Sequence, residues 1–102
     1  MSKIIIAKKV RPTQRQYEVL ILRVMGMKYP EIEKSLSISQ STVKKHLTQL
    51  MVKLNCFSQS ELVDFAKSKG WIESSLKSSG EIEYRVRPYE QVGALQIFKN
   101  LN

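Results

Sequence analysis

The feature that most constrains the fold is the segment from Ser39 to Asn55, where apolar residues recur with helical spacing. Four of them occupy positions i, i+4, i+7 and i+11: Val43, Leu47, Leu50 and Leu54. This spacing places all four on one face of an α-helix. Ser39 can cap the start of the helix, and Asn55 tolerates the left-handed backbone that often follows a helix end. Because such a helix gains most of its stability from tertiary packing, the segment should pack into a core.

Two shorter helices are predicted before this segment. The residues TQRQ at 13–16 have the form of a capping box, in which a side chain at each end satisfies a backbone N–H of the other. Gly26 then supplies a left-handed stop, so a helix is expected over residues 14–25. Pro30 suits the first turn of a second helix, because its missing N–H needs no partner there. That helix should be short and end near Ser37.

A fourth helix is predicted after the long one. The residues SQSE at 58–61 form a second capping-box pattern, and Gly70 closes the helical segment. The next residues, 74–80, are rich in turn formers and are interpreted as a linker. The chain is thus expected to divide into an N-terminal extended segment, a helical domain, and a linker with a strand-like tail: 1–11, 12–72 and 73–102.

Strand-like patterns flank the helices. A β-branched run stands at Ile4 to Ile6, residues 81–87 alternate polar and apolar, and residues 94–99 contain further apolar side chains. Residues 81–87 and 94–99 resemble the strands of a hairpin. Because a two-stranded ribbon is marginal alone, they should pair with Ile4 to Ile6, pack on the helices, or pair with a second chain. The apolar side chains for such a second-chain contact are Ile82, Tyr84 and Val86. The predicted fold class is mainly α, with four helices and short strand-like segments at both ends.

The charge distribution favours a polyanionic partner for the first half of the chain. The formal net charge is +8 and the sequence pI is about 9.8. Residues 1–53 contain eleven Lys and Arg against three Glu, whereas the remaining residues hold six basic and six acidic side chains. A strongly basic half suits nucleic acid or an acidic membrane surface.

Several classes of protein are disfavoured by what the sequence lacks. Cys56 is the only cysteine, so no intrachain disulfide can form and a reducing compartment, the cytosol, is expected. No apolar run is long enough to span a membrane. His46 is the only histidine, and there is neither a Cys/His cluster nor a Gly-rich phosphate loop. We therefore expect no catalytic site, no metal and no cofactor, and a structural role for His46.

The polar face of the 39–55 helix points to DNA. If the apolar stripe faces inward, the outward side chains are Gln40, Ser41, Lys44, Lys45, Thr48 and Gln49. No acidic residue occurs from Ser35 to Ser60. Lysine can donate to guanine edges in the major groove and glutamine to adenine, while hydroxyls and further cations hold phosphates. Two helices joined by a tight turn, the second with such a face, constitute a helix-turn-helix.

From Pro12 to Ile72 the sequence resembles the LuxR/GerE-type (NarL-like) helix-turn-helix domain of bacterial transcription regulators. The matching stretches occur in order and without gaps, which makes the combination specific. They are TQRQYEVL at 13–20, Gly26, EI at 31–32, LSIS at 36–39, STVKKHL at 41–47, KL at 53–54 and SELVDFA at 60–66.

The resemblance implies a sequence-specific DNA-binding regulator of transcription that acts as a homodimer on double-stranded DNA. It assigns base contacts to Lys44, Lys45 and Thr48, and backbone contacts to Thr42 and nearby polar residues. Because Lys28 stands at the start of the second helix, it should affect phosphate contacts there. The family's dimers form largely through the fourth helix, which makes the candidate interface residues Val63, Asp64 and Lys67.

Some residues depart from the family pattern. Glu33 replaces a usual small Ala, and Ser37 replaces the usual turn Gly. A serine held at positive φ costs about 1 kcal/mol relative to glycine. The family's upstream receiver or ligand-binding domain has no counterpart in the first ten residues, so the stand-alone type is expected.

A second hypothesis stays open beside DNA binding. The segment EIEKSLSISQSTVKKHL at 31–47 fits sigma region 4, a related helix-turn-helix, almost as well. The chain would then be an interaction module that acts on RNA polymerase or another regulator. The capped fourth helix favours the LuxR-type interpretation.

Overall fold

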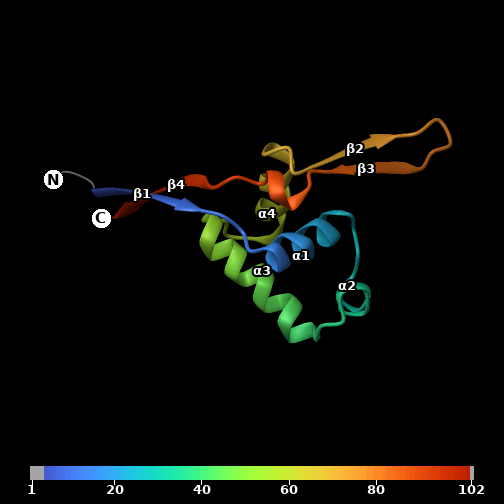
Figure 1. Cartoon of the computed structure of the whole chain (residues 1–102), viewed down its shortest axis with the longest axis horizontal. Coiled ribbons are helices and arrows are strands. Elements are labelled where there is room, and N and C mark those ends of the chain that lie inside the picture. Colours follow the sequence, from blue (N-terminus) through green and yellow to red (C-terminus); the bar gives the residue numbers. More distant parts are fainter. Residues whose placement is uncertain (1–3, 102) are drawn as a thin grey trace.

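The computed structural model describes residues 4–101 of the chain. Four helices form a central unit, and two antiparallel ribbons leave it on opposite sides (Figure 1). In chain order the elements are β1 (Ile4–Val10), α1 (Gln14–Val24), α2 (Tyr29–Leu36), α3 (Gln40–Leu54), α4 (Gln59–Ser68), β2 (Ile72–Leu76), β3 (Ile82–Val86), the 3₁₀ turn η1 (Tyr89–Gln91) and β4 (Leu95–Leu101). The ribbons make the molecule elongated, with a longest dimension of 57 Å.

The apolar stripe of α3 forms the centre of the core, as predicted. Its four side chains are at most 3% exposed. They pack with buried residues of the other three helices: Val19, Leu20, Ile32, Leu62 and Ala66. Trp71, directly after α4, is 2% exposed and its ring meets the edges of Tyr17 and Phe65 at centroid distances of 5.6 and 5.7 Å. The predicted mainly α fold with four helices and flanking strands is confirmed.

The helix ends follow the local signals with one exception. Thr13 Oγ1 accepts from the Gln16 N–H at 3.2 Å, and Gln16 Oε1 accepts from the Thr13 N–H at 3.0 Å, so the first capping box is complete. At the second one, Ser58 Oγ accepts from the Glu61 N–H, but the Glu61 carboxylate accepts from Phe57 instead of Ser58. Ser58 also differs from Thr13 in its backbone, which is more extended, with φ of −153° against −69°.

The turn between α2 and α3 contains the expected strain. Ser37 has φ of 54° and ψ of 47°, in the left-handed region, and its N–H donates to the Glu33 carbonyl. Asn55, after α3, has the same conformation with φ of 57°, as its position predicts. Left-handed backbone costs asparagine less than serine, so Ser37 is the position at which the turn departs from ordinary sequence preference.

The interpretation of residues 74–80 as a linker is wrong. Residues 72–76 form strand β2, which pairs with β3 in the register Ile72↔Val86, Ser74↔Tyr84 and Leu76↔Ile82. The turn formers instead occupy the hairpin turn, where the Gly80 N–H donates to Lys77 and Gly80 has φ of 88°. Two serines in β2 concealed the strand because their pairing with Glu83 and Tyr84 depends on β3, not on local composition.

A hairpin between residues 81–87 and 94–99 is also not formed. Strand β4 pairs with β1 in the register Val10↔Leu95 to Ile4↔Leu101, so the alternative in which the tail pairs with the N-terminal segment is correct. Tyr89 lies at the crossing between the two ribbons, in η1. Its hydroxyl donates to the Pro12 carbonyl at 2.6 Å, and the Arg11 side chain donates to the carbonyls of Tyr89 and Val92. These bonds fix where β1 and β4 leave the helices.

Candidate nucleic-acid interface

Helix α3 presents one polar face to solvent. Its outward residues match those expected from the spacing, and all are exposed: Gln40, Ser41, Lys44, Lys45, Thr48 and Gln49. Thr42 is half-buried, and its hydroxyl lies 2.9 Å from Ser39 Oγ, which also accepts from the Thr42 N–H. The face is therefore a row of cations, amides and hydroxyls without a carboxylate.

An apolar side chain on this face was not predicted as part of the site. Val52 is 65% exposed, one turn beyond Thr48. From the sequence, Val52 could have been recognised as an apolar residue of this helix that lies outside the buried stripe. An exposed valine beside polar side chains can contact a thymine methyl group or a sugar ring.

Tyr29 links the start of α3 to α2 and α4. Its hydroxyl accepts from Gln59 Nε2, and its ring lies 5.9 Å from Lys44 Nζ and 5.5 Å from the Arg23 guanidinium carbon. Lys28 and Gln40 border the same small hollow as Tyr29. The structure thus brings Lys28 next to the first turn of α3, and it adds Arg23, which sequence reasoning missed because the helix that carries it is remote from α3 in the chain.

The other end of the face is tied to α1 and β1. Gln49 Oε1 accepts from the Gln16 amide at 3.3 Å, and Lys53 Nζ donates to Gln16 Oε1 at 2.9 Å and to the Arg11 carbonyl at 3.2 Å. Gln16 is 5% exposed, so these bonds satisfy a buried amide. Gln49 is consequently more constrained than the sequence suggests, whereas the side chains of Lys44, Lys45 and Thr48 form no hydrogen bond with the residues that the structure describes.

His46 lies at the edge of the packing face. Burial lowers the pKa of His46 below its ordinary value of 6.5, and the positive charges of Arg15 and Lys45 lower it further. Its Nδ1 is buried and has no hydrogen-bond partner within residues 4–101. A proton there would leave a buried donor unsatisfied, so the neutral ring suits this position.

The candidate dimer residues lie together on α4. Asp64 and Lys67 are exposed and Val63 is half-buried. Their spacing of one and three residues places them on neighbouring faces of the helix, away from Leu62 and Ala66, which enter the core.

Two further classes of site find no support within the described residues. None of their helices has the length and hydrophobicity to cross a bilayer. Over the same residues, no three His, Cys, Asp or Glu side chains come together as metal ligands would.

Comparison with known proteins identifies the family. The GerE profile, described as bacterial regulatory proteins of the luxR family, matches residues 13–66. The transcriptional regulatory protein YvfU of Bacillus subtilis (strain 168), itself uncharacterized, is 35% identical over 60 residues, which are 59% of this chain and 30% of that protein. The oxygen regulatory protein NreC of Staphylococcus epidermidis is 38% identical over 61 residues, and NreC of Staphylococcus carnosus (strain TM300) is 40% identical over 57.

These two NreC alignments cover 60% and 56% of this chain but only 28% and 26% of the relatives. The chain therefore spans less than a third of the length of the relatives it matches. The family profile covers α1 to α4 almost completely and more than half of the chain. The chain belongs to the luxR family of bacterial regulatory proteins.

Proposed function

We propose that the chain is a sequence-specific DNA-binding regulator of transcription, in which the exposed face of α3 enters the major groove. The observation that carries the proposal is this face, which joins Lys44, Lys45 and Thr48 on a helix whose opposite side is buried. A helix of 15 residues is about 22 Å long and has a diameter that the major groove accepts. Family membership supports the proposal, since the relatives are named as regulatory proteins and not as enzymes.

In this arrangement Lys44, Lys45 and Thr48 contact base edges. Lys28, Ser41 and Thr42, at the starts of α2 and α3, contact the phosphate backbone, and Gln40 borders the same end of α3. Helix N-termini favour phosphate because their N–H groups are unpaired and the helix dipole is positive there. Gln49 contributes less to recognition, because its side-chain oxygen already accepts from Gln16.

The protein acts as a homodimer in this proposal, with α4 of each copy facing the other. The residues that would meet are Val63, Asp64 and Lys67. A dimer would read two half-sites related by a two-fold axis, so the operator should be roughly palindromic. Asp64→Lys alone should lower the affinity for a full operator but not for a half-site, because it would set lysines of the two copies against each other across the two-fold interface.

The test is selection of bound sequences from a random duplex pool, followed by titration of the best site at several salt concentrations. An enriched motif, bound with a steep salt dependence, is the expected result. Lys44→Ala and Lys45→Ala, made separately, should each weaken binding to this site by about 1–3 kcal/mol. The matched control is Lys69→Ala/Lys77→Ala, which removes the same charge from exposed positions outside α3.

Two outcomes would contradict the proposal. If the control weakened binding as much as Lys44→Ala/Lys45→Ala, the attraction would depend on net charge alone. If wild type bound DNA without an enriched motif but bound RNA polymerase, the chain would be an interaction module, the alternative that the sequence left open.

A further inference from the structure

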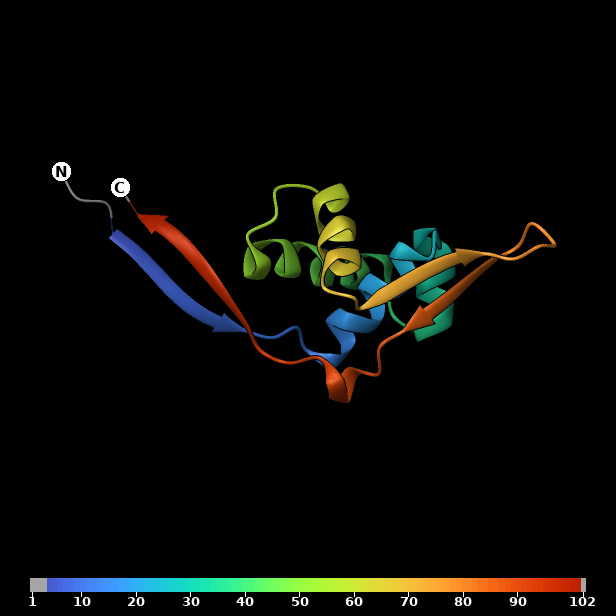
Figure 2. The same ribbon diagram turned by 90° about the horizontal axis from the view of Figure 1, so that it is seen from above.

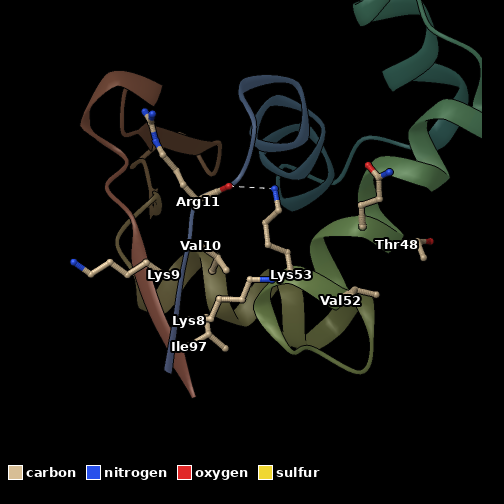
Figure 3. A pocket seen from close by; sticks show the side chains of 9 residues that line it. Lys8, Lys9, Val10, Arg11, Thr48, Val52, Lys53 and Ile97 are labelled. Atoms are coloured by element: carbon tan, nitrogen blue, oxygen red, sulfur yellow. Dashed lines mark hydrogen bonds between the residues drawn. The ribbon is translucent and has the colours of Figure 1, made fainter. Parts of the chain in front are cut away.

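A cleft separates the β1–β4 ribbon from the second half of α3 (Figure 3). It has a volume of about 570 Å³ and is lined by three elements. The residues are Lys8, Lys9, Val10 and Arg11 of β1 and its end, Thr48, Gln49, Val52 and Lys53 of α3, and Ile97 of β4. Thr48 and Gln49 belong to the outward face of α3 as well, so the cleft continues the candidate DNA surface onto the ribbon.

The side chains of Lys8 and Lys9, neighbours on β1, point in opposite directions. Figure 3 shows the Lys8 side chain extending toward α3 and the Lys9 side chain extending to the other side of the ribbon. Alternation along a strand requires this difference, and the register places Lys8 opposite Ile97, which also lines the cleft. Lys8 is exposed and forms no ion pair with any residue that the structure describes.

The second ammonium group of the cleft is held in place. Lys53 Nζ donates to the Arg11 carbonyl and to Gln16 Oε1, which uses two of its three N–H donors and leaves one free. The Arg11 guanidinium does not contribute to the cleft in the same way, because it donates to Val92 and Tyr89 and lies 4.2 Å from the Tyr89 ring. Lys8 and Lys53 therefore supply the positive charge, and none of the described residues that line the cleft is acidic.

The composition of the walls fits one nucleotide of a DNA backbone. Two ammonium groups and the Thr48 hydroxyl can bind a phosphate, while the exposed Val52 and the half-buried Ile97 offer apolar surface to a deoxyribose. A helix nearly fills the width of the major groove, so the phosphates that border the groove lie against whatever flanks the helix. Beside the second half of α3, that flanking element is the ribbon.

We infer that the β1–β4 ribbon is a second DNA-contacting element, in which Lys8, together with Lys53, binds a backbone phosphate at the edge of the groove that α3 enters. The inference rests on the proposed function, because it places α3 in the groove first. A phosphate contact positions the protein and carries no base preference. The ribbon thus adds affinity and fixes the orientation of α3, while sequence choice stays with Lys44, Lys45 and Thr48.

The experiment compares Lys8→Gln with Lys9→Gln in the full chain. Both variants remove one charge from neighbouring exposed residues of one strand, and only Lys8 extends toward α3. Lys8→Gln should weaken binding to the selected site and to unrelated duplex by the same several-fold factor, and should reduce the slope of log K against log salt by about one. Lys9→Gln should leave the slope close to that of wild type, and the selected motif should be unchanged in both.

The outcomes separate this inference from the proposed function. If wild type selects a motif but Lys8→Gln keeps the wild-type slope, Lys8 makes no phosphate contact. If Lys9→Gln reduces the slope as much as Lys8→Gln does, the loss depends on net charge alone. Both results overturn the inference and leave the role of α3 unaffected. If wild type shows no motif and no salt-dependent binding, the proposed function itself fails. Equal melting temperatures for the two variants would show that the difference in binding does not come from folding. Lys53 is unsuitable for this test because its bonds also hold Gln16 and Arg11.

Discussion

The two ribbons share antiparallel pairing but differ in the charges that they carry. Each consists of two antiparallel strands that leave the helical unit, on opposite sides (Figure 2). The strands of β1–β4 contain three lysines and no acidic residue, whereas residues 72–86 contain three glutamates with one lysine and one arginine. Pairing alone therefore does not decide what a ribbon contacts; its charge and its place on the helical unit do.

The surroundings of the two ribbons differ as well. The β1–β4 ribbon borders the exposed face of α3, whereas Val86 of β3 borders a hollow formed by α1 and α2. Toward its far end, β2–β3 exposes Leu76 and Ile82, which are 75% and 58% accessible. A cationic ribbon beside a cationic helix extends one surface toward a polyanion. The β2–β3 hairpin, with three glutamates and on the other side of the helical unit, does not.

The largest effect is expected where β2–β3 is attached. Trp71→Ala removes a buried ring that packs on Tyr17 and Phe65, next to the carbonyl that accepts from the Arg87 N–H at 2.8 Å. The free energy of unfolding should fall by about 3–5 kcal/mol, measured by urea titration. A loss below about 1 kcal/mol would contradict a firm attachment of this ribbon to the core.

A smaller loss is expected at the attachment of β1–β4. Arg11→Ala removes the hydrogen bonds to the Val92 and Tyr89 carbonyls and the contact with the Tyr89 ring. Because the side chain is exposed, the free energy of unfolding should fall by only about 1–2 kcal/mol. Lys9→Ala, on the same ribbon but without such bonds, is the control and should be nearly neutral. If both variants behaved alike, this ribbon would be held by its strand pairing alone.

Lowering the pH tests the stability of the helical unit from which both ribbons extend. The pKa of His46 is lowered in the folded protein, so below about 6.5 the unfolded chain binds the proton that the folded chain still excludes. The free energy of unfolding should therefore decrease as the pH falls from 7.5 to 5.5. His46→Gln should flatten this dependence, measured by urea titration at each pH. An unchanged slope in this variant would show that other groups cause the decrease.

The smallest effect is expected at the far end of β2–β3. Leu76→Ser/Ile82→Ser should change the free energy of unfolding by less than about 0.5 kcal/mol, because both side chains are already largely in solvent. The salt slope of DNA binding should equal that of wild type. A reduced slope would mean that the hairpin also contacts DNA, and the contrast between the ribbons would no longer hold.

The helices were predictable because their signals are local. Thr13, Ser39 and Asn55 mark helix ends through bonds or backbone angles within a few residues, and the stripe of α3 reports its own buried face. The outward face of α3 follows from the same periodicity. Its exposed residues could therefore be named without a structure, although their role on DNA stays a prediction.

The ribbons could not be assigned in the same way. Strand β4 pairs with β1, at the other end of the chain, and no local pattern shows this, so the local patterns could assign β3 to β4 as readily as to β2. For the same reason the meeting of Lys8 with Lys53 was missed, since only the pairing of β1 with β4 brings them to one cleft. The second capping box was only half correct, because the Glu61 carboxylate accepts from the Phe57 N–H instead of from Ser58.

The register of β1 with β4 has a consequence for synthesis on the ribosome. Residues 4–10 are translated before helices α1 to α4, whereas their partners, residues 95–101, are translated after these helices. The helical unit can fold meanwhile from contacts closer in sequence, whereas β1 must wait as an unpaired strand with an apolar beginning. Lysines on an open strand edge discourage pairing with other chains. Lys8 and Lys9 would thus protect the nascent protein before either could meet DNA.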